Sequence, residues 1–388
     1  MKKRLFSILM VVSLIFIFVA CSNNAEQESA TDEPTTAVIT EVPTTLEPTT
    51  EEPTEPAADL IEEMLAEMTV EEKVGQMFFA RCPDSDAAQT ASDYHLGGYI
   101  LFGRDFEGKT EDEVIADIES YQSASKIPML IGVDEEGGTV VRASYYLLDN
   151  AYLSPKDNYY SGGWNAVETT ENEKADFLLS LGINVNLAPV CDVTTNEDSF
   201  MYLRSFSGDA VEVCGYVTKT IEIYKNKGLG STLKHFPGYG DNVDTHTGIA
   251  YDNREYSQFA NIDFKPFEAG ISAGADCVLV AHNIVECMDS DYPASLSDKV
   301  HQILRYDLVF NGVIMTDDLI MDAITQYTGT EAAAVTAAKA GNDMLCCSDI
   351  EGQYPAVLEA VQSGEIPIAQ IDQSVKRILR WKQNLGLL

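Results

Sequence analysis

The stretch that decides the fold is residues 232–246, TLKHFPGYGDNVDTH, in which a short apolar run ends in two basic side chains and a glycine-rich loop follows. Near the end of this loop a carboxylate and an imidazole, Asp244 and His246, are two residues apart. An aspartate can hold one ring nitrogen of a nearby histidine, fix its tautomer and leave the other nitrogen facing a substrate. An Asp-x-His sequence also occurs in ordinary surface turns, so the pair needs support from the rest of the chain.

Short apolar runs alternate with amphipathic or alanine-rich segments over residues 59–388. The runs predict eight strands, at 75–80, 99–102, 129–134, 185–190, 232–235, 277–282, 313–317 and 343–346. The segments between them predict helices that include 111–125, 210–227, 297–309, 330–340 and 371–385. This alternation is typical of an α/β fold of the TIM type, a parallel (β/α)8 barrel, although a doubly wound open sheet alternates in the same way.

Polar residues at the ends of these runs favour the barrel. Asp134 ends the third run, Lys234 and His235 end the fifth, His282 ends the sixth and Asp317 ends the seventh. In a barrel the downstream ends of all strands meet on one face, where active sites are built. Because burying a charge is costly unless a site satisfies it, we expect these residues to form one pocket.

The first residues predict a targeting segment. Three basic residues at positions 2–4 precede an apolar stretch, 5–20, which is too short to span a bilayer comfortably but typical of a secretory signal. The stretch ends in VACS at 19–22, which resembles the lipobox of bacterial lipoproteins and predicts a signal peptide over 1–20 with a lipid on Cys21. We therefore expect an extracytoplasmic protein that is lipid-anchored to the bacterial cell membrane. Ordinary signal-peptidase cleavage and free secretion are the alternative.

Residues 21–58 predict a tether. They are rich in Thr, Pro and Glu and contain no Lys or Arg, so they cannot bury enough apolar surface to fold. Subtracting the nine carboxylates of this segment from the 62 of the chain, and three basic residues of the signal from 25, leaves 53 acidic and 22 basic residues. The resulting net charge of -31 for residues 59–388 argues against nucleic acid or an anionic lipid surface as a partner.

The cysteines give a modest constraint. Without Cys21 seven of the eight cysteines remain, an odd number with no Cys-x-x-Cys pair. Cys277, Cys346 and Cys347 lie in apolar runs, which predicts thiols packed as small hydrophobic side chains. We expect neither a disulfide framework nor a metal site, and no organic cofactor.

Six blocks of the sequence resemble a known family. KHFPGYG at 234–240, followed by DTH at 244–246, is similar to the signature of the β-N-acetylhexosaminidase branch of glycoside hydrolase family 3. VIMTDDL at 313–319 resembles the segment that contains that family's nucleophile. Further similar blocks follow the family's order: GVDEEGG at 132–138, LAPV at 187–190, RSF at 204–206 and AGNDM at 340–344. The resemblance implies one barrel domain over 59–388, without the second sandwich domain of larger members.

The resemblance also implies catalytic roles. Matched residue by residue, Asp317 is the nucleophile, His246 the general acid/base and Asp244 the carboxylate that orients the imidazole. In this retaining family the nucleophile forms a covalent glycosyl-enzyme, and the acid/base then activates the water that releases it. Asp318 is the competing nucleophile by adjacency, but the first Asp of the pair is the one that matches. A histidine with an ordinary pKa near 6.5 is able to donate and accept a proton around neutrality.

Five further residues are implied to hold the sugar. Asp134 matches the ligand of the hydroxyls at the far side of the ring, and the donors to hydroxyl or N-acetyl oxygens are Arg142, Arg204, Lys234 and His235. An internal ion-pair network around Asp134 is a structural alternative that is compatible with this role.

The expected protein is a monomeric, exo-acting β-N-acetylglucosaminidase, whose partner is a GlcNAc-containing saccharide such as a muropeptide. A β-glucosidase or a β-N-acetylglucosaminide phosphorylase of the same family is one alternative. A catalytically silent sugar-binding lipoprotein is the alternative from another class.

The sequence departs from the family pattern at four places. Tyr239 stands where His is commonest, Thr139 where an Arg often follows the Gly-Gly pair, and Ala250 where a Pro usually follows the loop. Gly240 and Asp244 are separated by three residues where the family commonly has four, so the loop is one residue shorter. Because Asp244 and its histidine are both present, we expect an adjusted loop rather than a lost activity.

Overall fold

The computed structural model describes residues 59–388, so the predicted signal peptide, tether and Cys21 lie outside the described part. Eight parallel strands form one sheet in the order β10-β1-β2-β3-β4-β5-β7-β9. Their bounds are β1 (Phe78–Arg81), β2 (Gly98–Leu101), β3 (Leu130–Val133), β4 (Val185–Asn186), β5 (Gly230–Phe236), β7 (Cys277–Val280), β9 (Val313–Thr316) and β10 (Leu345–Cys347).

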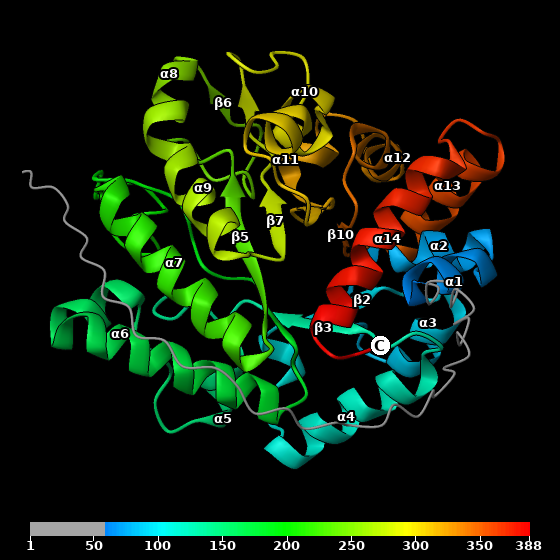
Figure 1. Cartoon of the computed structure of the whole chain (residues 1–388), viewed down its shortest axis with the longest axis horizontal. Helices are drawn as coiled ribbons and strands as arrows, with labels where there is room; N and C mark the ends of the chain where they lie inside the picture. Colours follow the sequence, from blue (N-terminus) through cyan, green and yellow to red (C-terminus); the bar gives the residue numbers. More distant parts are fainter. Residues whose placement is uncertain (1–58) are drawn as a thin grey trace, which may run out of the picture. The chain divides into compact units, whose positions relative to one another are not determined.

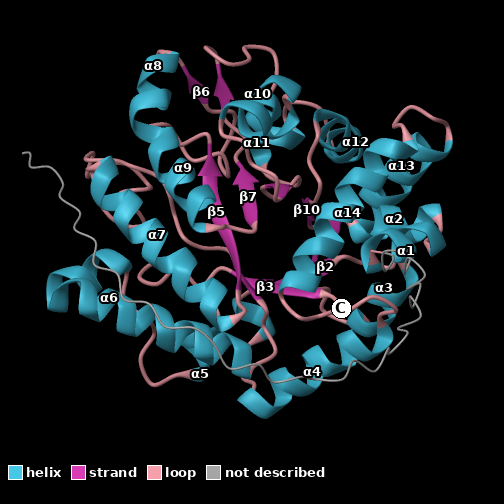
Figure 2. Cartoon of the chain, viewed as in Figure 1, coloured by secondary structure: helices cyan, strands magenta, loops and turns pink. Residues whose placement is uncertain are grey.

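The two ends of this sheet meet between β9 and β10. Met315 forms a parallel bridge with Met344. The backbone N–H of Thr316 donates to the carbonyl oxygen of Met344 at 3.1 Å, and that of Asp343 donates to Ile314 at 2.8 Å. The sheet is therefore closed, and the predicted (β/α)8 barrel is confirmed. Figure 2 shows the strands in magenta on the inside and the helices in cyan around them.

Helices surround the strands (Figure 1). The longer ones are α3 (Ala87–Asp93), α4 (Glu111–Ala124), α6 (Pro155–Ser180), α7 (Ala210–Lys227), α9 (Phe264–Ala273), α12 (Thr330–Ala340), α13 (Ile350–Gln362) and α14 (Ile368–Asn384). Two helices precede the barrel, α1 (Leu60–Glu67) and α2 (Val70–Gln76). Short elements in the connections are α5 (Ala143–Leu147), α8 (Tyr256–Gln258), α10 (Asp298–Gln302), α11 (Asp322–Thr325), the paired strands β6 (Tyr251–Asp252) and β8 (Ile284–Val285), 3-10 turns at Gly103–Asp105 and Ala294–Leu296, and π turns at Phe259–Asp263 and Ile303–Asp307.

Most predicted elements agree with the structure, but the predicted strand at 185–190 is regular only over Val185–Asn186, and the predicted helix at 297–309 consists of α10 and the π turn at Ile303–Asp307. The predicted helices at 210–227 and 330–340 coincide with α7 and α12. The predicted strand at 75–80 was wrong in its first half, because residues 75 and 76 complete helix α2. That helix begins with a capping box in which Thr69 Oγ1 accepts from the Glu72 N–H and a Glu72 carboxylate oxygen accepts from the Thr69 N–H. This cap stabilises a helical turn that the apolar pattern of the segment did not reveal.

Packing inside the barrel depends on two glycines. A Cβ atom at Gly98 or Gly132 would lie 2.6 or 2.4 Å from the ring of Phe79, which is fully buried. The phenyl ring therefore fills space that other residues at these two positions would occupy. The expected buried thiols are confirmed nearby, since Cys346 and Cys347 in β10, like Cys277 in β7, are buried and free.

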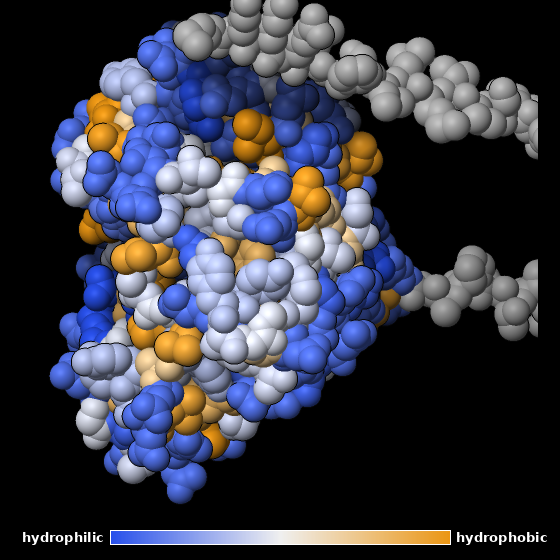
Figure 3. Space-filling view, turned by 90° about the vertical axis from the view of Figure 1, so that its left-hand side faces the viewer, coloured by the Kyte–Doolittle hydropathy of each residue, from blue (hydrophilic) through white to orange (hydrophobic). Residues whose placement is uncertain are grey.

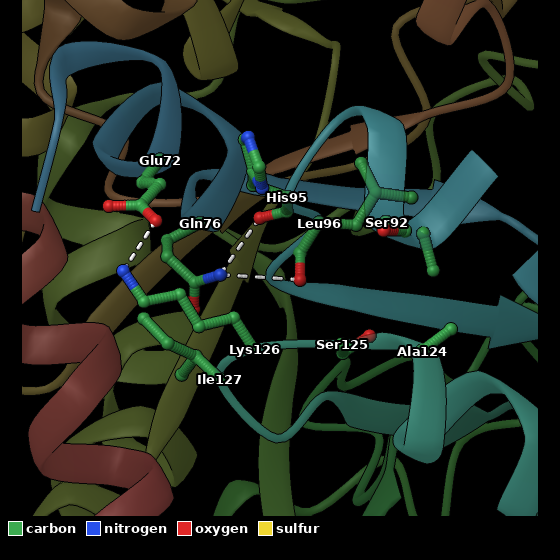
Figure 4. A pocket seen from close by; sticks show the side chains of 10 residues that line it. Glu72, Gln76, Ser92, His95, Leu96, Ala124, Ser125, Lys126 and Ile127 are labelled. Carbon is green, nitrogen blue, oxygen red and sulfur yellow. Dashed lines mark hydrogen bonds and ion pairs between the residues drawn. The ribbon is translucent and has the colours of Figure 1, made fainter. Parts of the chain in front are cut away.

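A small cavity with polar and apolar lining residues lies at the N-terminal ends of the strands (Figure 4). Its volume is about 110 Å³. The side-chain nitrogen of Gln76 donates to the carbonyl oxygens of His95 at 2.8 Å and Leu96 at 3.3 Å. The side-chain oxygen of Gln76 accepts from Nζ of Lys382 in α14 at 2.6 Å, and Lys382 is fully buried. This face of a barrel contributes to stability rather than to chemistry.

The molecular surface drawn in Figure 3 is mostly hydrophilic, with apolar side chains in small scattered patches. Such scattered patches are normal for the outer surface of a folded domain. Over residues 59–388, no helix combines the length and the apolar character needed to cross a membrane.

Candidate active site

One pocket of about 450 Å³ lies at the C-terminal ends of the strands. Figure 1 shows β5 and β7 pointing toward the part of the molecule that contains β6, α10 and α11, which is the same side. The lining includes seven of the eight residues predicted from the sequence to form the site: Asp134, Arg142, Arg204, Lys234, His235, His246 and Asp317. Asp244, the eighth, is hydrogen-bonded to His246. The barrel thus brings together side chains that are up to 183 residues apart in the sequence, from Asp134 to Asp317.

Glu136 is the centre of an ion-pair network on one side of this pocket. Its carboxylate accepts from Nζ of Lys234 at 2.6 Å and from Nη2 and Nε of Arg204 at 2.7 and 3.0 Å. Lys234 Nζ also donates to Asp134 at 2.6 Å. Burial raises the pKa of the Glu136 carboxyl, but the charges of Arg204 and Lys234 outweigh burial and hold it well below its usual range. The carboxylate is therefore ionised, and it fixes two cations in the wall of the pocket.

His235 is held in one tautomer by its neighbours. Its Nδ1 lies 2.8 Å from Oδ2 of the buried Asp192, and its Nε2 lies 2.9 Å from Nη2 of Arg204. Because a carboxylate only accepts and a guanidinium only donates, Nδ1 bears the proton and Nε2 accepts. Asp192 also accepts from the backbone N–H of Tyr239 at 2.8 Å. This aspartate therefore connects the strand β5 to the loop that follows it.

Asp317 directly follows β9, and its environment favours the ionised form. Burial raises the pKa of this carboxyl, but the imidazoles of His282, His235 and His246 outweigh burial and hold the pKa below its ordinary value. One oxygen, Oδ1, accepts from the backbone N–H of Asp318 at 2.9 Å. No hydrogen bond to the other oxygen, Oδ2, is present among residues 59–388.

Both carboxylate oxygens of Asp318 accept hydrogen bonds from neighbouring residues of the protein. Its Oδ1 accepts from the backbone N–H groups of Ile320 at 3.2 Å and Ser348 at 3.1 Å, and its Oδ2 accepts from the Ser348 hydroxyl. The carbonyl oxygen of Asp318 accepts from Nε2 of the buried His282 at 3.0 Å. His282, which the sequence placed at a strand end, therefore lies behind this turn and does not line the pocket.

The loop after β5 presents the imidazole. Nδ1 of His246 lies 2.7 Å from Oδ1 of Asp244, which also accepts from the His246 backbone N–H at 3.0 Å. Asp244 therefore accepts the proton on Nδ1, and Nε2 is left as the nitrogen available for proton exchange. The imidazole is 63% exposed, so the pocket is open to solvent on this side.

Sequence reasoning missed two carboxylates that support the lining of this pocket, Glu136 behind Arg204 and Lys234, and Asp192 behind His235. Glu136 is two residues after Asp134, inside the block at 132–138, but both residues lie beyond the end of β3, where strand alternation no longer predicts the direction of a side chain. Asp192 follows the apolar run at 185–190, so the strand-end pattern that identified the other polar residues applies to it too. Within residues 59–388, no cluster of three or more His, Cys, Asp or Glu side chains has an arrangement suited to a metal ion.

The fold and pocket together define a class of protein. A parallel barrel with an ionised carboxylate, an aspartate-bound imidazole and several cationic hydrogen-bond donors at the C-terminal ends of its strands has the groups needed to cleave glycosidic bonds. Residues 69–381 match the family description "Glycosyl hydrolase family 3 N terminal domain". The chain belongs to glycosyl hydrolase family 3 and is a glycoside hydrolase, which confirms the resemblance seen in the sequence.

Individual relatives agree with this assignment. The chain is 28% identical over 383 residues to "Beta-hexosaminidase LpqI" of Mycobacterium tuberculosis, with 94% of each chain covered. It is 32% identical over 279 residues to a "Beta-hexosaminidase" of Tolumonas auensis, covering 69% of this chain and 80% of that one. Among solved structures, the family 3 β-N-acetylglucosaminidase of Paenibacillus sp. str. FPU-7 superposes with a TM-score of 0.78 at 30% identity, over 82% of this chain and 63% of that one. The chain thus spans less than two thirds of the Paenibacillus enzyme.

Proposed function

We propose that the protein is an exo-acting, retaining β-N-acetylglucosaminidase with Asp317 as nucleophile and His246 as general acid/base. One observation carries this proposal: the ionised Asp317 and the Asp244-bound imidazole of His246 line the same pocket, next to the donors for a sugar. The similarity to proteins named β-hexosaminidases and to a solved β-N-acetylglucosaminidase supports the choice of sugar.

The proposed reaction has two steps. In the first, Asp317 attacks the anomeric carbon while the Nε2 proton of His246 passes to the departing glycosidic oxygen, which leaves a covalent glycosyl-enzyme. In the second, the neutral imidazole takes a proton from a water molecule, which attacks the same carbon and releases the sugar with retained configuration. The two neighbouring carboxylates have separate roles, since the oxygens of Asp318 are occupied by Ile320 and Ser348.

The sugar itself would be held by the ion-paired side of the pocket. Asp134 accepts hydroxyl protons, and Arg204 and Lys234 donate to hydroxyl or N-acetyl oxygens, with Arg142 and His235 completing the set. The ion pairs with Glu136 and Asp134 do not prevent this role, because an arginine has five N–H donors and a lysine three, and the ion pairs use only some of them. Glu136, which lies beneath them, keeps these donors in place.

The distribution of arginines supports a leaving group with an anionic part, as in a muropeptide. Residues 59–388 contain eight arginines, and six of them form an ion pair with a carboxylate. The two without such a partner in this part of the chain, Arg81 and Arg142, both line the catalytic pocket. In a protein with so large an excess of acidic residues, unneutralised arginines in a binding pocket indicate an anionic ligand.

The location is proposed from the N-terminal sequence. A lipid on Cys21 would attach the enzyme to the outer face of the membrane, and residues 22–58 would separate the barrel domain from it. Incorporation of labelled palmitate by the wild type, and its absence in Cys21→Ser, would support this anchor. Label in the serine variant or none in the wild type would contradict it. Light scattering tests the expected monomer.

Aryl glycosides test the proposed activity. The purified protein is incubated with p-nitrophenyl β-GlcNAc and p-nitrophenyl β-Glc, with and without phosphate, beside Asp317→Asn and His246→Ala. Asp298→Asn is the matched control, because it makes the same chemical change at an exposed position of α10. We expect release from the GlcNAc compound, near-complete loss in Asp317→Asn, partial loss in His246→Ala and no change in the control.

Each alternative function has its own outcome. Faster release from β-Glc indicates a β-glucosidase, and release that requires phosphate and yields a sugar phosphate indicates a phosphorylase. Binding of GlcNAc without turnover of either compound indicates a silent sugar-binding protein. Full activity in Asp317→Asn would refute the nucleophile.

A further inference from the structure

The catalytic loop is attached to the barrel through the residue between the two members of the dyad. Thr245 is fully buried, whereas Asp244 is half-buried and His246 is exposed. The carbonyl oxygen of Thr245 accepts from the backbone N–H of Ala323 in α11 at 3.3 Å. The position of Thr245 therefore determines the positions of the two residues on either side of it.

Tyr239 holds this threonine from the barrel side. The tyrosine hydroxyl lies 2.6 Å from the Thr245 hydroxyl, and both groups are buried. The tyrosine is itself fixed, because its backbone N–H donates to Asp192 at 2.8 Å and its ring packs edge-on against Phe200 and His235 at centroid distances of 5.0 and 5.2 Å. A hydrogen bond between two fixed, buried groups restricts the loop more than an exposed one would.

The charge state of Tyr239 preserves this hydrogen bond across the working range of pH. Burial, together with the nearby carboxylate of Asp317, raises the pKa of the tyrosine hydroxyl well above its ordinary value. The phenol therefore stays neutral and keeps its proton. Both hydroxyls can then share one hydrogen bond without burying a charge.

We propose that Tyr239 is a positioning residue whose hydrogen bond to Thr245 sets the Asp244–His246 dyad at the pocket in a loop that is one residue shorter than is common in its family. This inference rests on the proposed function and extends it to a residue that does not take part in the chemistry. The tyrosine stands where the family commonly has a histidine, and its side chain reaches from the first residues after β5 to Thr245 near the end of the shortened loop. The side chain of Tyr239 thus compensates for the missing backbone residue of the loop.

Two substrates that differ in their leaving group distinguish a positioning role of Tyr239 from a general loss of activity. A leaving group of low pKa departs without protonation, so kcat/KM for a substrate that contains it does not depend on the general acid. A leaving group of high pKa must be protonated as it departs, so kcat/KM for such a substrate does depend on the general acid. We compare 2,4-dinitrophenyl β-GlcNAc with phenyl β-GlcNAc in Tyr239→Phe, Thr245→Val and the double variant. Thr245→Ser, which keeps the hydroxyl, is the conservative variant. Tyr251→Phe makes the same change as Tyr239→Phe at an exposed tyrosine of β6 and is the control.

We expect kcat/KM to fall mainly for phenyl β-GlcNAc, the substrate whose leaving group needs protonation. Removing one hydroxyl should lower kcat/KM for phenyl β-GlcNAc by about 3- to 10-fold, the effect of one hydrogen bond. The loss for the dinitrophenyl compound should stay below about twofold, since that substrate does not need the proton. The double variant should lose no more than either single variant, because both changes remove the same hydrogen bond. Thr245→Ser and the Tyr251→Phe control should keep wild-type values.

Several outcomes would overturn the inference. Equal losses for both leaving groups, additive losses in the double variant or unchanged rates in Tyr239→Phe are each incompatible with a shared positioning bond. If Tyr239→Phe fails to fold in a urea titration, Thr245→Val tests the same hydrogen bond from its other end. When the wild type cleaves these glycosides and Asp317→Asn does not, such outcomes reject this inference alone. An inactive wild type rejects the proposed function as well.

Discussion

The buried lysine of α14 predicts an unusual dependence of stability on pH. Lys382 is fully buried and its Nζ donates to Gln76 at 2.6 Å, but it takes part in none of the ion pairs formed within residues 59–388. Burial lowers the pKa of Lys382 to about 7, whereas an unfolded lysine has a pKa near 10.4. Between these two values the unfolded chain binds the extra proton, so the free energy of unfolding rises with pH. The destabilising contribution is complete below about pH 7 and disappears above about pH 10.

The magnitude of this effect on the free energy of unfolding follows from the one proton that the unfolded chain binds in excess of the folded chain. One proton changes the free energy of unfolding by about 1.4 kcal/mol per pH unit, so the contribution of Lys382 between pH 7.5 and 9.5 is about 3 kcal/mol. Urea titrations of the wild type and Lys382→Met at these two pH values measure it. We expect the wild type to gain about 3 kcal/mol more than the variant, because titrations shared by both proteins cancel.

A matched lysine provides the control for this experiment. Lys126→Met makes the same change at an exposed lysine that pairs with Glu72, and its pH dependence should follow the wild type. The loss of the hydrogen bond to Gln76 shifts the Lys382→Met curve equally at both pH values and leaves its slope unaffected. Parallel curves for the wild type and Lys382→Met would refute the argument from burial.

Two residues that line the catalytic pocket, Arg81 and Asp317, and one that lies behind its wall, Glu136, give further tests. Glu136→Gln removes the carboxylate shared by Lys234 and Arg204, and we expect a loss of about 3–5 kcal/mol in the free energy of unfolding together with a higher KM; an unchanged KM would contradict its place beneath the sugar. Arg81→Gln should lower kcat/KM several-fold for a GlcNAc–muramic acid disaccharide at low salt and leave p-nitrophenyl β-GlcNAc unaffected; equal effects on both substrates would speak against an anionic contact. The acid limb of kcat/KM should lie below about pH 4, because Asp317 acts as a carboxylate, its pKa is below the ordinary value, and activity is lost as it becomes protonated; a limb near pH 6 would be inconsistent with an ionised nucleophile.

The sequence predicted those features that depend on local pattern. Asp134, Lys234 and Asp317 each end an apolar run, and a barrel brings such ends together whatever the details of its loops. The dyad was also visible, because Asp244 and His246 are close enough in sequence to interact within one turn of the loop. The roles of these residues stay predictions until the variants are measured.

Features that depend on distant contacts were not predictable in this way. Glu136 is one acidic residue among many until Arg204, 68 residues later in the sequence, is seen to pair with it. The hydrogen bond between Tyr239 and Thr245 requires a loop conformation that no periodic pattern describes. The extension of α2 over residues 75 and 76 depends on a cap at Thr69, whereas the apolar run alone favours a strand.

In the proposed enzyme, the attacking carboxylate and the proton donor belong to different parts of the architecture. Asp317 directly follows β9 in the closed wall of the barrel, whereas His246 stands on a connection that tolerates insertions and deletions. A change in the length of this connection moves the donor and leaves the attacking group where it was. The protonation step can therefore be adjusted through this loop without disturbing the position of the attacking carboxylate.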